Sequence, residues 1–190
     1  MALPQILPVK YEKGLGYIDA HPDSGIAFDR VHALPSPLDL VQYVDAEYGR
    51  NATTGMSDEG QIIFLNGYVV SWSMKGQTMV AGSTYEAEII AFSNGARQLC
   101  KIRNYIDGCG YELGPTPVYE DNNSVLRYAR DIGLARPARS LNQLLHYGRE
   151  KQQTGIIELL PVTSEDNIAD LVAEVSIQSY TAALKQRCTG

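Results

Sequence analysis

The 190-residue chain is poor in the residues that several common functional classes require. Its three cysteines, Cys100, Cys109 and Cys188, are odd in number, and their spacing fits neither a disulfide framework nor a zinc site. Its three histidines accompany no nucleophile motif, and its glycines form no phosphate-binding loop of the P-loop type. We therefore interpret the cysteines as free thiols in a reducing compartment.

Positive charge and long apolar runs are also scarce. Sixteen Lys and Arg residues against 22 Asp and Glu residues give a net charge of −6, which is unusual for a stand-alone nucleic-acid binder. No apolar run approaches the about 18 residues that a membrane-spanning helix needs, so we expect no membrane association. A hydrophobic fraction of 44% and a charged fraction of 20% are typical of a soluble globular protein.

The distribution of proline suggests an arm followed by a domain. Five of the nine prolines lie before residue 38, in a region with little hydrophobic periodicity. We expect residues 1–37 to form an N-terminal arm with one short strand at 25–28. Residues 38–190 are expected to form one domain with an ordinary hydrophobic core.

Strand and helix signals alternate within this domain. The apolar run at 38–48 predicts a buried strand, and Asn66-Gly67 between two strand-like runs predicts a hairpin. Ser83 and Glu86 have capping-box spacing at the start of a long helix with one apolar face. The remaining signals predict a strand at 116–119, helices at 125–131 and 140–153, a strand at 155–160 and a helix at 166–185. This order predicts a mixed α/β fold, in which a five-stranded sheet with its first three strands antiparallel is flanked by helices.

Three carboxylates stand out in this pattern. Asp45 lies in the apolar strand, and Glu88 falls roughly 40° from the centre of the apolar stripe of the long helix, so both are in positions where a charge is costly. Asp121 ends the next strand, and the carboxyl ends of neighbouring strands converge at one edge of an open α/β sheet. Ordinary explanations remain: Asp45 could meet solvent or an arginine, and Asp121 could cap the following helix.

Three carboxylates at one edge of a sheet would repel one another unless cations neutralised them. Oxygen-only ligands suit Mg²⁺ or Mn²⁺. Such a site suits hydrolysis of a phosphodiester by two metal ions, one generating hydroxide from water and the other stabilising the leaving oxygen. The most basic stretch of the chain is either a solvated helix face or a nucleic-acid contact; it contains Arg136, Arg139, His146, Arg149 and Lys151.

Six segments occur in the order found in one family: Tyr43-Val-Asp-Ala-Glu-Tyr48, Ile63-Phe-Leu-Asn-Gly-Tyr-Val-Val-Ser-Trp-Ser73, Ser83-Thr-Tyr-Glu-Ala-Glu-Ile-Ile-Ala91, Glu120-Asp-Asn-Asn-Ser124, Arg149-Glu150 and Asn167-Ile-Ala-Asp170. The chain thereby resembles the ribonuclease H domain at the end of the polyprotein of Ty1/copia-type LTR retrotransposons, over about residues 38–175. The resemblance implies a ribonuclease H-like fold. It also implies that four acids bind two Mg²⁺ or Mn²⁺ ions and act in catalysis: Asp45, Glu88, Asp121 and Asp170. Asp170 rests on the resemblance alone, because it lies nearly opposite the apolar stripe of its helix.

The resemblance implies an endoribonuclease that cleaves the RNA strand of RNA–DNA hybrids during reverse transcription. A reverse transcriptase domain in cis or in trans would be its partner, and it would act in the cytoplasm, in virus-like particles or in the nucleus. Recognition of the hybrid would rest on minor-groove shape and 2′-hydroxyl contacts. Two departures from the family pattern occur: the loop at 161–166 lacks a histidine that would assist product release, and Ser140 and Asn142 replace a His-x-Asp pair.

Two other functions stay open at this stage. A domesticated or degenerate copy could keep the fold as a binding or scaffold module, although all four acids are intact. An integrase-like strand-transfer enzyme could use the same fold, but the Ser-Thr-x-Glu-Ala-Glu helix after a hairpin disfavours it. A carboxylate-dependent effect of Mg²⁺ on thermal melting would separate a nuclease from a scaffold.

Overall fold

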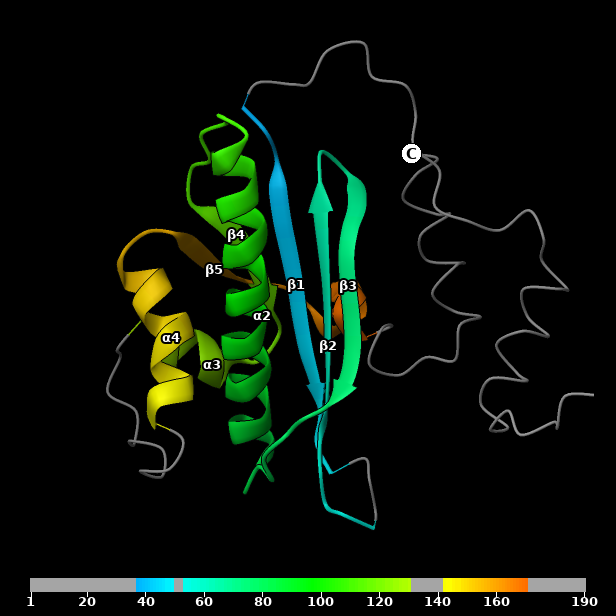
Figure 1. The fold of residues 1–190 in the computed structure, drawn as a ribbon. Coiled ribbons are helices and arrows are strands. Elements are labelled where there is room, and N and C mark those ends of the chain that lie inside the picture. The colour runs from blue at the N-terminus through cyan, green and yellow to red at the C-terminus, as the bar shows by residue number, and fades with distance from the viewer. Residues whose placement is uncertain (1–36, 50–52, 131–141, 171–190) are drawn as a thin grey trace, which may run out of the picture. The chain divides into compact units, whose positions relative to one another are not determined.

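The computed structural model describes residues 37–49, 53–130 and 142–170, and these form a sheet with helices packed beside it (Figure 1). The strands are β1 Leu40–Glu47, β2 Asp58–Leu65, β3 Tyr68–Gly76, β4 Thr116–Glu120 and β5 Ile157–Pro161. The helices are α2 Thr84–Gly108, α3 Asn123–Ala129 and α4 Asn142–Gln153, with a short 3-10 turn, η1, at Ser164–Asp166. Among these described helices, none combines the length and apolarity needed to cross a bilayer.

The sheet has five strands in the order β3-β2-β1-β4-β5. β1 pairs antiparallel with β2, and β2 pairs antiparallel with β3. β4 runs parallel to β1 and to β5. The predicted mixed five-stranded sheet with three antiparallel first strands is confirmed, and β1 lies at its centre.

Several expectations fall on parts of the chain that the structure does not describe. The arm before residue 37, its strand at 25–28 and the start of the predicted 140–153 helix lie outside the described residues. Of the predicted final helix at 166–185, residues 166–170 are described: Asp166 ends the 3-10 turn, Asn167 is not helical, and residues 168–170 are helical. The boundary between arm and domain therefore stays a prediction.

The predicted hairpin joins β2 to β3. Asn66 and Gly67 both have positive φ, 52° and 81°, as a type I′ turn requires. The turn is also tied to the start of β1, because the Asn66 N–H donates to the Asp39 carbonyl at 2.7 Å and the Asp39 N–H donates to Asn66 Oδ1 at 2.8 Å. The hairpin thus fixes the register of the three antiparallel strands.

The start of β2 differs from the sequence prediction. The apolar run before Asn66-Gly67 opens at Gln61, and the polar residues up to Gly60 predict a loop, but β2 begins at Asp58. Glu59 is buried in the strand because Lys75 Nζ lies 3.1 Å from its Oε1 and Asn94 Nδ2 donates to its Oε2 at 2.8 Å. The Glu59 carboxylate is therefore stabilised in the interior by Lys75 from β3 and Asn94 from α2.

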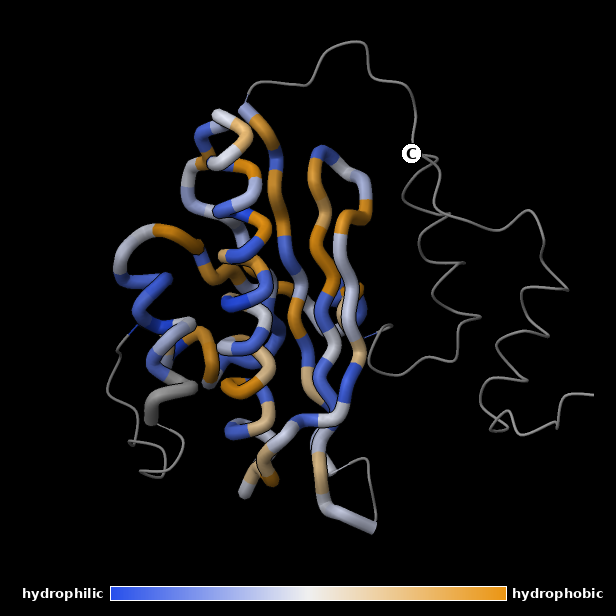
Figure 2. Tube along the Cα trace, in the orientation of Figure 1, coloured by the Kyte–Doolittle hydropathy of each residue, from blue (hydrophilic) through white to orange (hydrophobic). Residues whose placement is uncertain are grey.

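The long helix α2 begins as predicted at the Ser83 cap. Ser83 Oγ accepts from the Glu86 N–H at 3.2 Å, and Glu86 Oε2 accepts from the Gly82 N–H at 2.7 Å rather than from the capping residue itself. The predicted apolar stripe is buried except at Ile102, which is partly exposed; its buried members are Ile89, Phe92, Ala96, Leu99 and Ile106. Figure 2 shows the hydrophobic segments of the strands and of α2 alternating with hydrophilic ones.

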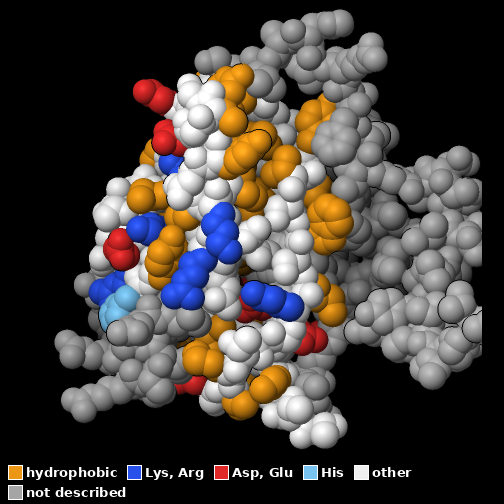
Figure 3. Space-filling view, viewed as in Figure 1, with side chains coloured by type: hydrophobic (Ala, Val, Ile, Leu, Met, Phe, Trp, Pro, Cys, Tyr) orange, Lys and Arg blue, Asp and Glu red, His pale blue; other side chains and the backbone are white. Residues whose placement is uncertain are grey.

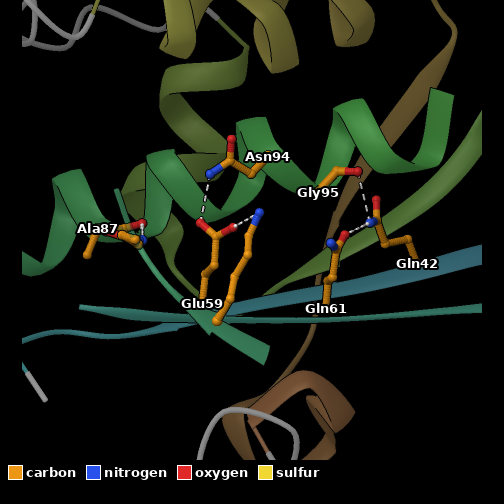
Figure 4. A network of polar contacts seen from close by, with 8 residues as sticks. Gln42, Glu59, Gln61, Ala87, Asn94 and Gly95 are labelled. Carbon is orange, nitrogen blue, oxygen red and sulfur yellow. Dashed lines mark hydrogen bonds and ion pairs between the residues drawn. The ribbon is translucent and has the colours of Figure 1, made fainter. Parts of the chain in front are cut away.

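Polar side chains fix α2 against the sheet (Figure 4). Gln42 Nε2 donates to Gln61 Oε1 and to the Gly95 carbonyl, both at 3.0 Å. Gln77 Nε2 donates to the Ala87 carbonyl at 2.8 Å. Because buried amides need specific partners, these bonds fix the position of α2 against β1 and against the residue that follows β3.

Gly95 lets α2 approach β1 closely. A Cβ atom at this position would lie 2.6 Å from Val44 Cγ1 and 3.2 Å from Gln42 Nε2. The missing side chain therefore determines the distance between the helix and the central strand, and through it the reach of Glu88 toward Asp45.

We predict that Gly95→Ala lowers the free energy of unfolding by about 1–3 kcal/mol, because the added methyl overpacks the contact with β1. The matched control is Gly108→Ala at the end of the same helix, where a Cβ meets nothing within 4 Å. That control should be neutral or stabilising by up to about 1 kcal/mol. Denaturant unfolding of both variants measures the difference, and equal effects would contradict the close approach.

Candidate metal centre

Three acids from separate elements meet at the carboxyl ends of β1 and β4. Asp45 comes from β1, Glu88 from the first turns of α2, and Asp121 follows β4 directly. One carboxylate oxygen from each lies within 4.8 Å of the others, with Asp45 and Glu88 buried and Asp121 half-buried. Opposite ligands of a Mg²⁺ ion lie about 4 Å apart, so small side-chain rotations suffice to bring all three oxygens onto one ion.

The local structure explains why Glu88 faces this site. The Ser83 cap sets the phase of α2, and the backbone N–H of Ala46 donates to the Glu88 carboxyl. Within the described residues, Glu88 Oε2 is buried and has no hydrogen-bond donor. A buried acceptor of this kind, among other carboxylates, fits a cation ligand.

The alternative explanations for Asp45 and Asp121 can be judged from their surroundings. Asp45 is only 6% exposed, so the solvent-facing alternative is wrong. The cap of α3 is Asn122, whose Oδ1 accepts from the Ser124 N–H at 2.9 Å, so the capping role expected for Asp121 is also wrong. Asp121 Oδ2 instead accepts from Ser164 Oγ at 2.6 Å.

Asp170 lies near Asp45, Glu88 and Asp121 but does not belong to the cluster that these three form. Helical geometry alone predicted an exposed residue, but Asp170 is half-buried, and its negative charge contributes to raising the pKa of Glu88. The residue just before this helical segment, Asn167, donates from Nδ2 to the Val44 carbonyl at 3.0 Å. The segment carrying Asp170 is therefore attached to β1 next to Asp45. The catalytic and metal-binding roles of all four acids stay a prediction.

Burial and mutual repulsion dominate the electrostatics of the site. Burial, together with the negative charges of Asp45 and Asp121, raises the pKa of the Glu88 carboxyl to about 9. At neutral pH without a cation, Glu88 therefore keeps its proton. A bound divalent cation would displace that proton, because only the carboxylate form is a ligand.

Glu120 is a fifth carboxyl group that the sequence analysis missed. It ends β4 fully buried, and burial, followed by the charge of Glu88, holds the pKa of its carboxyl well above the ordinary value. Its Oε1 accepts from the Asn122 N–H at 3.1 Å. Strand alternation could have found it, since Thr116, Val118 and Glu120 share one buried face of β4.

The predicted nucleic-acid contacts are only partly described. Arg136 and Arg139 lie outside the described residues. The Arg149 guanidinium lies 5.4 Å from the Tyr128 ring centroid, and Lys151 Nζ lies 4.9 Å from the Tyr147 ring centroid and 3.0 Å from Glu150 Oε1. These contacts hold both side chains on the body of the domain. Figure 3 shows Lys and Arg side chains gathered near the middle of the viewed face.

Solved structures identify the fold. LC11-RNase H1 in complex with an RNA/DNA hybrid superposes with a TM-score of 0.56 at 14% identity, covering 74% of this chain and 98% of that one. RNase H1 from the halophilic archaeon Halobacterium salinarum superposes with a TM-score of 0.51 at 12% identity, covering 74% and 98%. The domain therefore has a ribonuclease H-like fold, as the sequence resemblance predicted.

Sequence relatives point to retrotransposons. The chain is 27% identical over 172 residues to the retrovirus-related Pol polyprotein from transposon RE2 of Arabidopsis thaliana, covering 88% of this chain and 12% of that polyprotein. It is 24% identical over 136 residues to the corresponding polyprotein from transposon TNT 1-94 of Nicotiana tabacum, covering 72% and 10%. No protein-family model matches the chain. Its homologues are thus Ty1/copia-type Pol polyproteins, of which it spans about a tenth, and the resemblance seen in the sequence is confirmed.

We predict that the metal-free protein becomes less stable as the pH rises from about 5 to 9. With a folded pKa of about 9 against an ordinary 4.5, the Glu88 carboxyl keeps a proton in the folded state that it loses in the unfolded state over this range. The free energy of unfolding therefore falls with pH, and the raised pKa of Glu120 acts in the same direction. Chemical denaturation in EDTA at several pH values measures this slope. Glu88→Gln should flatten it, whereas Glu112→Gln, at an exposed position, should leave it unchanged. An unchanged slope in Glu88→Gln would contradict the buried, protonated carboxyl.

Proposed function

We propose that this chain is a metal-dependent ribonuclease H that cleaves the RNA strand of RNA–DNA hybrids during reverse transcription. The observation that carries the proposal is the cluster of Asp45, Glu88 and Asp121 at the carboxyl ends of β1 and β4 in a ribonuclease H-like fold. Two findings support the choice of substrate and setting. One structural relative is described in complex with an RNA/DNA hybrid, and the sequence relatives are Pol polyproteins.

The four acids are proposed to hold two Mg²⁺ or Mn²⁺ ions, which would activate a water molecule and stabilise the leaving 3′ oxygen. Asp45 would bind from the central strand and Asp121 from the end of its parallel neighbour. Glu88 gives up its proton when it becomes a ligand, so cation affinity rises with pH. Asp170 completes the set from the segment attached to β1. The Ala46 N–H, which donates to the Glu88 carboxyl, holds this group in position.

Binding of the hybrid is proposed to involve Arg136, Arg139, Arg149 and Lys151. The net charge of −6 indicates that these residues supply only part of the affinity for a polyanion. A reverse transcriptase domain, joined to this chain or associated with it, is proposed to supply the rest. The protein would then act where reverse transcription occurs, in the cytoplasm, in virus-like particles or in the nucleus.

We predict that Asp45→Asn lowers cleavage of a labelled RNA–DNA hybrid by at least about 100-fold in Mg²⁺ or Mn²⁺. Removing groups that merely orient metal ligands costs 10–100-fold, so loss of a central ligand should cost more than most of these. The matched control is Asp39→Asn, the same substitution at an exposed position just before β1, which should keep full activity.

RNA–RNA and DNA–DNA duplexes of the same sequence should remain uncut. If the folded wild-type protein cut no hybrid with either metal, alone or joined to a reverse transcriptase, the catalytic proposal would be wrong. The scaffold alternative would then be favoured.

A further inference from the structure

The connector between β5 and Asp170, residues 162–167, contacts both strands that carry the metal centre. At its start, the Val162 N–H donates to the Glu120 carbonyl at 3.1 Å, which joins the connector to the end of β4. At its end, the buried Asn167 donates from Nδ2 to the Val44 carbonyl at 3.0 Å, which joins it to β1. The connector is therefore fixed at two points beside the acids.

Between these two points, Ser164 reaches one of the proposed ligands. Its Oγ donates to Asp121 Oδ2 at 2.6 Å, a short bond of the kind that a hydroxyl makes to a charged carboxylate. Asp121 lies just beyond the end of β4, where no strand ladder restrains it, and it is only partly buried. Its side chain thus depends on this contact for its orientation more than Asp45 or Glu88 do, since both are buried.

We propose that Ser164 is a positioning residue for the metal centre. It holds the Asp121 carboxylate by Oδ2 and leaves Oδ1 to bind the cation. This inference rests on the proposed function, because it concerns the same site. Ser164 neither touches substrate nor takes part in a proton transfer; it acts through Asp121. The connector thus orients Asp121 through Ser164, and it positions Asp170 through Asn167.

The connector itself offers a matched control. Thr163 Oγ1 donates to Asp166 Oδ2 at 2.8 Å, so this neighbouring hydroxyl makes the same kind of bond but to a carboxylate outside the cluster. Both residues are exposed, and each can lose its hydroxyl without opening the core. Comparing Ser164→Ala with Thr163→Val therefore separates positioning of a ligand from simple loss of a hydrogen bond in the loop.

The test measures the Mn²⁺ concentration that gives half of the maximal metal-induced rise in melting temperature, and separately the Mg²⁺ concentration for half-maximal hybrid cleavage. Ser164→Ala should raise both by about tenfold, which is the lower limit for groups that orient metal ligands. The melting temperature without metal and the KM for the hybrid should not change, and saturating metal should restore kcat. Ser164→Thr should keep both midpoints, because it keeps the hydroxyl.

Two results would overturn the inference. If Ser164→Ala has the same metal midpoints as the wild type, the Ser164 hydroxyl does not position Asp121 for metal binding. If Ser164→Ala and Thr163→Val raise the midpoints equally, the effect comes from the loop in general. Both results require a wild type that responds to metal. A wild type that gives no metal-dependent rise in melting temperature would overturn the metal centre itself, and that failure is seen before any variant is compared.

Discussion

The repulsion among buried carboxyl groups is the constraint on which the rest of this structure depends. Asp45, Glu88 and Asp121 converge from three elements, and the fully buried Glu120 directly precedes Asp121 in the chain. Their proximity and burial raise the pKa of Glu88 to about 9, so a proton stays in the cluster at neutral pH unless a cation replaces it. Such an arrangement lowers the stability of the free domain, and binding of the proposed divalent ion would relieve the repulsion. Carboxyl groups with raised pKa values, at a cost in stability, are common in sites that bind metal and phosphate together.

The rest of the domain keeps these groups together against that repulsion. Gly95 allows α2 to approach β1, and the amide of Gln42 fixes the helix at that distance. The Ser83 cap sets the phase of α2, and in this phase Glu88 points toward β1. On the other side, Asn167 attaches the segment of Asp170 to the same strand. The contacts of Gln42 and Asn167 join residues distant in sequence, so the site forms only when α2 and the segment of Asp170 pack against β1.

The sequence predicted what depends on local patterns. Asn66-Gly67, the Ser83 cap and the apolar stripe of α2 were sufficient for the hairpin, the helix start and its buried face. The inward position of Glu88 followed from helical phase. Features that depend on partners elsewhere were missed. Burial of Glu59 requires Lys75 and Asn94, and the bond from Ser164 to Asp121 joins residues 43 positions apart. The half-buried position of Asp170 likewise reflects its attachment to β1, which helical phase cannot reveal.

A crystal structure of the wild-type domain soaked with Mn²⁺, with anomalous diffraction to locate the metal, tests the central claim most directly. The account predicts a Mn²⁺ peak within coordination distance of Asp45, Glu88 and Asp121, and no such peak in Asp45→Asn crystals treated in the same way. Wild-type crystals with an empty cluster at saturating Mn²⁺, or with the ion bound only elsewhere, would contradict it.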